Sequence, residues 1–168
     1  YKKHVMLLFQ NNSRLIYGAC IVLMSLFLKI LDLKPIGVNF YGDAGTGKTL
    51  LLEVMASLVG KFNSIIHNWH QTITSIENLA FSHNDAPLFL DELGQCNPEQ
   101  LRDIIYLLGN GEGKGRANSS AEQKLVKKFK TCTISSGEKT IAEVQAECRK
   151  KSTAGLESRL LDIPAVPF

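Results

Sequence analysis

The chain has 168 residues, 45% of them hydrophobic and 21% charged, which predicts one domain with a sizeable buried core. Its net charge of +3 is too small by itself to imply a polyanionic partner. The four cysteines are far apart and show no CxxC spacing, which argues against a zinc site or a disulfide framework and favours a reducing, cytoplasmic compartment. Because the chain starts at Tyr1 and stops at Phe168 after a proline-punctuated apolar stretch, we expect it to be part of a longer protein.

Residues 15–33 form the first apolar run and predict a buried helix. Gly18 and Ser25 lie inside the run and Lys29 ends its uninterrupted part, so a membrane span is the weaker alternative. Pro35 closes the helix, because the residue before a proline is pushed out of the helical region. We expect residues 1–34 to pack as a helical segment on a core formed by residues 35–168.

A glycine-rich loop follows an apolar strand pattern at residues 36–41 and precedes a helical pattern. A strand, a glycine loop and a helix start form the context that a phosphate-binding loop requires, with backbone N–H groups and the helix N-terminus facing the phosphates. Lys48 is expected to reach the β- and γ-phosphates of ATP, and Thr49 to bind Mg²⁺. The expected nucleotide-binding residues are Gly42, Asp43, Ala44, Gly45, Thr46, Gly47, Lys48, Thr49 and Leu50.

Strands and helices then alternate, as in a parallel sheet with helical crossovers. Residues 64–68 predict a short strand and residues 73–82 a helix, and residues 87–91 predict a strand buried on both faces. Two carboxylates, Asp91 and Glu92, end this strand at the edge where open α/β sheets bind ligands. We assign Asp91 to Mg²⁺ and Glu92 to deprotonation of the attacking water, because successive strand residues point opposite ways. A solvated strand end is the alternative.

A helix capped by an asparagine is predicted over residues 97–109, and the glycine-rich residues 109–120 are expected to form no regular structure. Residues 109–130 carry six basic side chains and two acidic ones, so the positive charge is concentrated there. Such a segment suits a phosphodiester backbone, and we expect Lys114 and Arg116 to contact nucleic acid. An ordinary solvated loop, or one that contacts the nucleotide of a neighbouring subunit, is the alternative.

Residues 131–136 predict a fourth strand that ends in hydroxyl groups. We expect Ser136, with Ser135 as the second choice, to hydrogen-bond the γ-phosphate or the attacking water; turn-forming serines are the alternative. A helix is predicted over residues 139–148. Arg159 then opens a final buried strand, either as a surface ion-pair partner or as an arginine finger that completes the active site of a neighbouring subunit.

Three histidines, His67, His70 and His83, have no further ligands at suitable spacing, so we interpret them as structural residues. Trp69 is expected to anchor the core. The only metal that we expect is therefore Mg²⁺ at Thr49 and Asp91.

Together these motifs resemble the helicase-like domain of unknown function found in proteins of phages, plasmids and cassette-type mobile elements. The motifs that carry the resemblance are residues 42–49, Trp69 with Thr72, and residues 83–85, 90–92, 109–117, 135–138 and 159–165. That family is similar to AAA+ ATPases of the minichromosome-maintenance type. The resemblance implies a sheet in AAA+ strand order, a hexameric ring and DNA unwinding, with Arg159 at the place of the trans-acting arginine and residues 109–120 at the place of a pore hairpin. One departure is serine, at 135 and 136, where that type usually has asparagine at the sensor.

These interpretations favour an α/β P-loop NTPase of AAA+ type, with a central parallel sheet flanked by helices and no obvious lid. Its expected function is the ATP-hydrolysing motor of an oligomeric DNA helicase that replicates a mobile genetic element, with single-stranded or forked DNA as partner and no membrane. The leading alternative is a nucleotide-dependent DNA-binding initiator or loader without unwinding activity. A small-molecule kinase would need a substrate pocket and lid arginines, and a GTPase is disfavoured because no Asn-Lys-x-Asp motif occurs.

Overall fold

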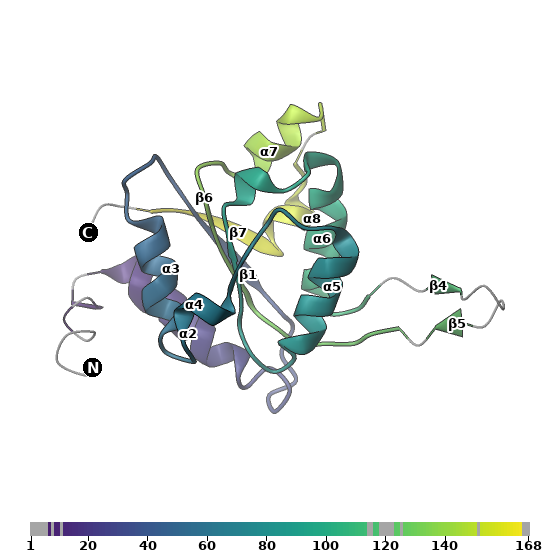
Figure 1. The fold of residues 1–168 in the computed structure, drawn as a ribbon, viewed down its shortest axis with the longest axis horizontal. Coiled ribbons are helices and arrows are strands. Elements are labelled where there is room, and N and C mark those ends of the chain that lie inside the picture. Colours follow the sequence, from purple (N-terminus) through teal and green to yellow (C-terminus); the bar gives the residue numbers. More distant parts are fainter. Residues whose placement is uncertain are drawn as a thin grey trace.

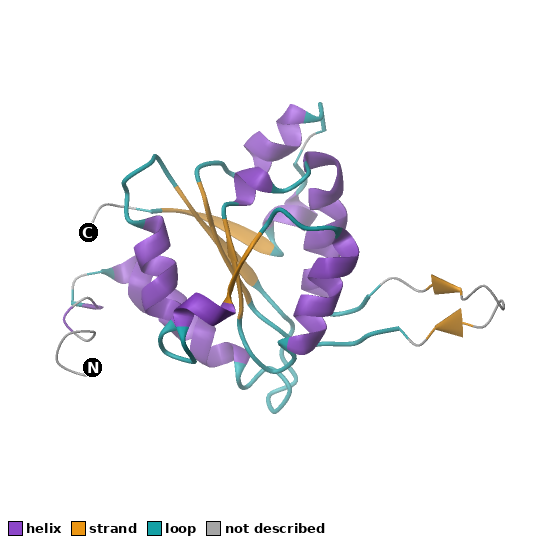
Figure 2. Cartoon of the chain, viewed as in Figure 1, coloured by secondary structure: helices purple, strands orange, loops and turns teal. Residues whose placement is uncertain are grey.

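A five-stranded parallel sheet in the order β2-β3-β6-β1-β7 forms the centre of the molecule. The computed structural model describes residues 7, 9, 10, 12–113, 116, 117, 123, 124, 126–150 and 152–165. The strands of the sheet are β1 (Gly37–Tyr41), β2 (Ile66–Asn68), β3 (Leu88–Asp91), β6 (Thr133–Gly137) and β7 (Leu160–Pro164). Helices lie on both sides of these strands (Figure 2), so the three-layer α/β architecture predicted from the alternation of elements is confirmed.

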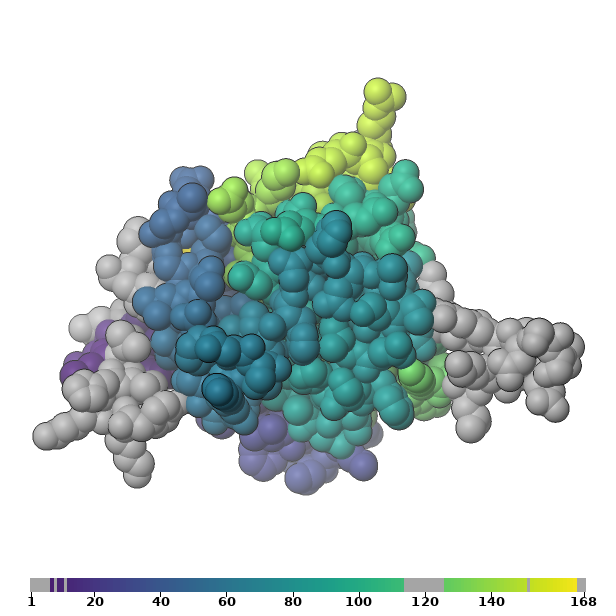
Figure 3. Space-filling model, in the orientation of Figure 1, coloured from purple at the N-terminus to yellow at the C-terminus, as the bar shows by residue number. Residues whose placement is uncertain are grey.

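Two hydrophobic cores fill the spaces between the layers. The first joins the sheet to α2 (Ser13–Ser25) and α3 (Lys48–Ala56), with α4 (Phe62–Ile65) at its margin, and the second joins it to α5 (Ile73–Ser82), α6 (Pro98–Asn110), α7 (Ile141–Glu147) and α8 (Ala154–Glu157) (Figure 1). Neighbouring residues of β3 enter different cores: Phe89 packs in the first and Leu90 in the second, and both are fully buried. A strand buried on both faces shows no polar alternation, which is why residues 87–90 are uniformly apolar. In the space-filling view, teal side chains from the region of α5 and α6 cover the middle of one face (Figure 3).

The first helix differs from the prediction for residues 15–33. α2 ends at Ser25, whose Oγ donates a 2.6 Å hydrogen bond to the carbonyl of Val22 and so competes with helical bonding, and turns follow. Only one side of this segment is buried, because a helix on a sheet buries the stripe that faces it. The large side chains left at least 47% exposed are Ile16, Leu23, Phe27, Ile30 and Leu31. In the part of the chain that the structure describes, no helix is long and apolar enough to span a membrane.

Several predicted boundaries are confirmed and others move by a few residues. α5 has the predicted bounds, and α6 begins after Asn97, whose side chain accepts a 3.0 Å hydrogen bond from the N–H of Glu99. α6 ends at a left-handed Gly111 rather than at Gly109. β2 is shorter than predicted because residues 62–65 form α4.

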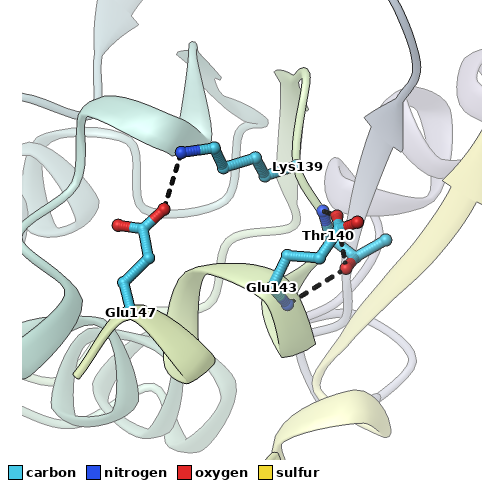
Figure 4. Close-up of polar contacts among 4 residues, drawn as sticks. All are labelled: Lys139, Thr140, Glu143 and Glu147. Atoms are coloured by element: carbon cyan, nitrogen blue, oxygen red, sulfur yellow. Dashed lines mark hydrogen bonds and ion pairs between the residues drawn. The ribbon is translucent and has the colours of Figure 1, made fainter. Parts of the chain in front are cut away.

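α7 begins two residues later than predicted because a capping box fixes its start (Figure 4). Thr140 Oγ1 accepts from the N–H of Glu143 at 3.2 Å, and Glu143 Oε2 accepts from the N–H of Thr140 at 2.7 Å. These two bonds satisfy N–H groups that a helix start otherwise leaves unpaired. Lys139, just before the cap, pairs with Glu147 at 2.6 Å at the other end of the helix.

Two expectations about the second half of the chain are wrong. Residues 109–120 were expected to lack regular structure, but β4 (Arg116–Ala117) pairs antiparallel with β5 (Gln123–Lys124), and Glu112 forms a bridge with Lys128. The β4–β5 pair projects from the body of the molecule (Figure 1). The final strand was expected to be buried, but β7 is an edge strand in which only Leu160 is buried.

Candidate nucleotide site

The glycine loop lies at the carboxyl end of β1, where the chain turns into α3 (Figure 1). Gly45 and Gly47 have φ angles of 82° and 81°, in the left-handed region that favours glycine. Gly47 is also the N-cap of the nine-residue helix α3. The strand, loop and helix start therefore bring unpaired N–H groups and the positive end of the helix to one place, which is a binding site for an anion.

Lys48 closes this loop from the inside. Its side chain is 9% exposed, and its Nζ donates 2.7 Å hydrogen bonds to the carbonyl oxygens of Gly42 and Asp43. Thr46 Oγ1 donates to the same Asp43 carbonyl at 2.8 Å. Thr49 and Leu50 lie exposed in the first turn of α3, and Ala44 lies exposed in the loop before it. These residues fit the polyphosphate of a nucleotide, since the ammonium group is already centred in the loop.

Asp91 and Ser136 meet on the face of the sheet that carries the glycine loop. Asp91 lies two residues beyond Phe89 on β3, and Ser136 two beyond Ile134 on β6, so both point to the α3 side. Ser136 Oγ donates a hydrogen bond to Asp91 Oδ1, which also accepts from the N–H of Glu92 at 3.0 Å. Mg²⁺ prefers oxygen ligands, so Asp91 and the hydroxyl of Thr49 are the residues that could hold it.

Glu92 occupies a strained turn directly after β3. Its φ and ψ are 61° and 72°, which a glutamate adopts only when its surroundings enforce it. Its Oε1 lies 3.2 Å from the point that a Cβ on Gly94 would occupy, and a Cβ on Gly137 would lie 2.9 Å from the nitrogen of Leu93. The two glycines thus let the Glu92 turn lie directly against the end of β6. Strain of this kind is common where a side chain must be aimed for function.

Ser135 points to the other side of the sheet and belongs to a buried polar network. Its Oγ accepts from Trp69 Nε1 at 2.8 Å and donates to Asn39 Oδ1 at 3.0 Å. Asn39 Nδ2 donates to Asp162 Oδ1 at 2.7 Å, and Asp162 Oδ2 accepts from the N–H of Ile141 at the start of α7 at 2.9 Å. Burial raises the pKa of Asp162, and these hydrogen bonds oppose the shift. The sequence analysis found Trp69 as a core anchor but missed the rest of this network.

Arg159 lies at the opposite end of the sheet from the glycine loop. Its carbonyl accepts from the N–H of Gly37, the first residue of β1, at 2.8 Å, whereas the loop follows the last. A strand of this length separates its ends by roughly 13 Å. The guanidinium donates to Asn110 Oδ1 at 3.2 Å and to the carbonyl of Gly155 at 2.8 Å, and it stacks on the ring of Tyr106 at 4.8 Å. Arg159 is therefore held on α6, away from the nucleotide loop of its own chain.

Of the two predicted nucleic-acid residues, Lys114 lies outside the described residues, and only the backbone of Arg116 is described. The base of the β4–β5 segment is held on α5. Lys127 Nζ donates to Asn78 Oδ1 and lies 5.3 Å from the centre of the Phe81 ring. Lys127, after β5, is thus anchored on α5.

The predicted structural histidines include a pair, His67 and His83, whose rings meet edge to face at 5.4 Å. Burial, and to a lesser extent the charge of His83, lowers the pKa of His67. Among residues with a described placement, no group of three or more His, Cys, Asp or Glu side chains could hold a metal ion. The four cysteines are free thiols, and burial raises the pKa of Cys96 to about 12.

Residues 1–128 match the family model described as Domain of unknown function (DUF927). The chain belongs to the DUF927 family. No curated protein matches the DUF927 chain in sequence.

Among solved structures, the DUF927 chain is similar to one described as SCCmec type IV Cch, active helicase, with a TM-score of 0.66 and 20% identity over 92% of this chain and 28% of that one. It is also similar to NtrX from Brucella abortus in complex with ATP (TM-score 0.49, 16% identity, 87% and 37% of the two chains). A RuvB mutant from Thermotoga maritima gives a TM-score of 0.41 at 15% identity, over 88% and 44% of the two chains. The DUF927 chain thus shares the fold of the Cch helicase and spans about 28% of its length.

Proposed function

We propose that this chain is the ATP-hydrolysing motor core of an oligomeric DNA helicase of AAA+ type, cytoplasmic and serving the replication of a mobile genetic element. The observation that carries the proposal is the division of the polar residues between the two ends of the sheet. Lys48, Asp91 and Ser136 gather at the end with the glycine loop, and Arg159 is fixed at the other. Such a division suits an active site that lies between two subunits and is complete only in an oligomer. We propose that this oligomer is a hexameric ring.

Each residue of the loop end has a distinct role in this proposal. The loop from Gly42 to Leu50 binds the nucleotide, and Lys48 leaves its backbone carbonyls to stabilise the β- and γ-phosphates. Mg²⁺, when bound by Thr49 and Asp91, neutralises charge on the phosphate oxygens. Glu92 takes the proton of the attacking water, and Ser136 positions Asp91.

The strand order and the comparisons support the AAA+ assignment. The loop strand β1 lies beside β6, which carries Ser136, and β6 lies beside the acidic strand β3. This is the order that the resemblance to AAA+ ATPases implies. The shared fold with the Cch helicase supports a motor on DNA, with Lys114 and Arg116 of the projecting segment as the proposed DNA contacts.

The test is ATP hydrolysis by the protein with and without single-stranded DNA, for wild type and for Lys114→Ala/Arg116→Ala. We expect DNA to stimulate hydrolysis, the double substitution to remove the stimulation, and forked DNA to be unwound. Absence of hydrolysis would overturn the proposal. Hydrolysis without strand displacement would instead favour the second candidate, a nucleotide-dependent DNA-binding initiator or loader.

A further inference from the structure

A hollow of about 610 Å³ lies at the amino-terminal ends of the strands, the end that is farther from the glycine loop. Its lining includes Lys34, Asn110, Glu112 and Arg159. The residues come from the turn before β1, from the end of α6 and from the start of β7. Its volume lies within the range of about 300–1,000 Å³ that is usual for small-molecule sites.

The hollow contains two cations that no carboxylate neutralises within the described part of the chain. Glu112 is paired with Lys128 at 3.1 Å. Arg159 has only neutral partners there, the side-chain oxygen of Asn110, the carbonyl of Gly155 and the ring of Tyr106. Lys34 is exposed, and no described residue hydrogen-bonds or pairs with it. Two unneutralised cations that line one hollow favour an anionic ligand.

That anion cannot be the nucleotide of the same chain. Gly37, three residues after Lys34, is the first residue of β1, and the glycine loop follows the last. The roughly 13 Å length of the strand separates Lys34 from its own loop, as it separates Arg159. A ligand that reaches Arg159 from a neighbouring subunit must enter the hollow that Lys34 also lines.

We propose that Lys34 is a second trans-acting cation, which contacts the triphosphate bound by the neighbouring subunit beside Arg159. This assignment rests on the proposed ATPase function. The two side chains differ in the contacts that each must break to reach a phosphate. Arg159 must break three hydrogen bonds, two to Asn110 Oδ1 and one to the Gly155 carbonyl, and a ring contact. Lys34 has no described partner to leave and carries its charge on a flexible four-carbon stem. Lys34 therefore has no described contact to break when it meets the incoming phosphates.

The test compares Lys34→Ala, Lys34→Arg and Lys29→Ala in the protein, each alone and mixed with Glu92→Gln. Lys29 is the matched control, because it lies on the same edge, has a side chain that is 74% exposed, and does not line this hollow. We expect Lys34→Ala to lower ATP turnover by about tenfold or more while its Kd for a fluorescent ATP analogue changes less than about twofold. Lys34→Arg keeps the charge and most of the turnover, and Lys29→Ala changes neither quantity.

Mixing decides whether Lys34 acts in trans. A Lys34→Ala subunit keeps its own loop and Glu92, so a Glu92→Gln neighbour with an intact Lys34 restores turnover. Unchanged turnover in Lys34→Ala, or a loss that mixing does not restore while the loss in Arg159→Ala is restored, would overturn the inference and leave the proposed function standing. A loss of DNA binding in Lys34→Ala without trans rescue would also overturn it, because Lys34 would then contact a nucleic-acid phosphate. An inactive wild type would instead count against the proposed function.

Discussion

Ser136 on β6 donates a hydrogen bond to the carboxylate of Asp91 on the neighbouring strand β3. Asp91 Oδ1 accepts this bond and one from the N–H of Glu92, whereas Oδ2 accepts none in the described part of the structure. The serine thus fixes the rotation of the carboxylate and leaves one oxygen for a cation. Asp91 is thus the side-chain partner of the Ser136 hydroxyl among the described residues.

The two adjacent serines are therefore expected to respond differently to replacement by alanine. Ser136→Ala frees the Asp91 carboxylate, and we expect ATP turnover to fall by about tenfold with little change in stability. Ser135→Ala leaves Trp69 Nε1 and Asn39 Oδ1 buried without this partner and lowers the free energy of unfolding by about 1–3 kcal/mol. Steady-state hydrolysis and urea denaturation of both variants measure the two effects. Equal loss of stability in both variants would contradict the division of roles.

Glu92 is both the proposed catalytic base and a residue with a strained backbone. Different substitutions at this position should therefore change ATP hydrolysis and the free energy of unfolding independently. Glu92→Gln keeps the hydrogen-bonding shape but cannot accept the proton, and we expect ATP binding to persist while hydrolysis is abolished. Glu92→Gly also relieves the left-handed φ of 61° and should raise the free energy of unfolding by about 1 kcal/mol. Denaturation and nucleotide-binding measurements on both variants test this. Parallel loss of binding and hydrolysis in Glu92→Gln would refute the assignment of the base.

Arg159 should act on the nucleotide of a neighbour, because it is held at the end of the sheet away from its own loop. Arg159→Ala subunits are expected to lose ATP turnover by about a thousandfold. When they are mixed with Glu92→Gln subunits, turnover should return, since each supplies what the other lacks. Hydrolysis across a series of mixing ratios measures this, with each variant alone as the control. If no ratio restores activity, Arg159 does not act in trans.

Asp162 gives a pH dependence with a defined sign. Its pKa is raised above the ordinary value of 3.8, chiefly by burial, so the native chain holds the proton more tightly than the unfolded chain. Its contribution to the free energy of unfolding therefore falls as the pH rises from 3.8 through the raised pKa, and then levels off. Asp162→Asn cannot ionise, so the stability of wild type relative to this variant should decline over that window. Urea denaturation at steps between about pH 3 and 7 tests this, and a relative stability that increases with pH would contradict it.

The sequence was sufficient where local signals and burial agree. The strand before the glycine loop, α5 and the start of α6 follow from apolar spacing and from an asparagine cap, and tertiary packing did not override them. The helix after the glycine loop was also predictable, because a phosphate-binding loop always joins a strand to a helix. The roles of the site residues stay predictions.

The sequence was insufficient where a property depends on distant partners. Nothing local distinguishes Ser135 from Ser136, and only the pairing of β6 with β3 and β1 shows that one meets Asp91 and the other Asn39. The residues by themselves did not predict the pairing of β4 with β5, because basic residues and alanine have weak strand preferences, although the family resemblance placed a hairpin at residues 109–120. The edge position of β7 depends on the order of the strands, which composition does not report.

Two backbone carbonyl oxygens of the glycine loop, those of Gly42 and Asp43, hold the ammonium group of Lys48. In the proposed function, phosphates must replace these carbonyl oxygens as partners of the ammonium group, which weakens nucleotide affinity relative to a loop with a free lysine. The same two oxygens recapture the ammonium when phosphates leave. In the proposed function, this competition favours rapid exchange of nucleotide over tight retention, which suits an ATPase that must release its product in every cycle.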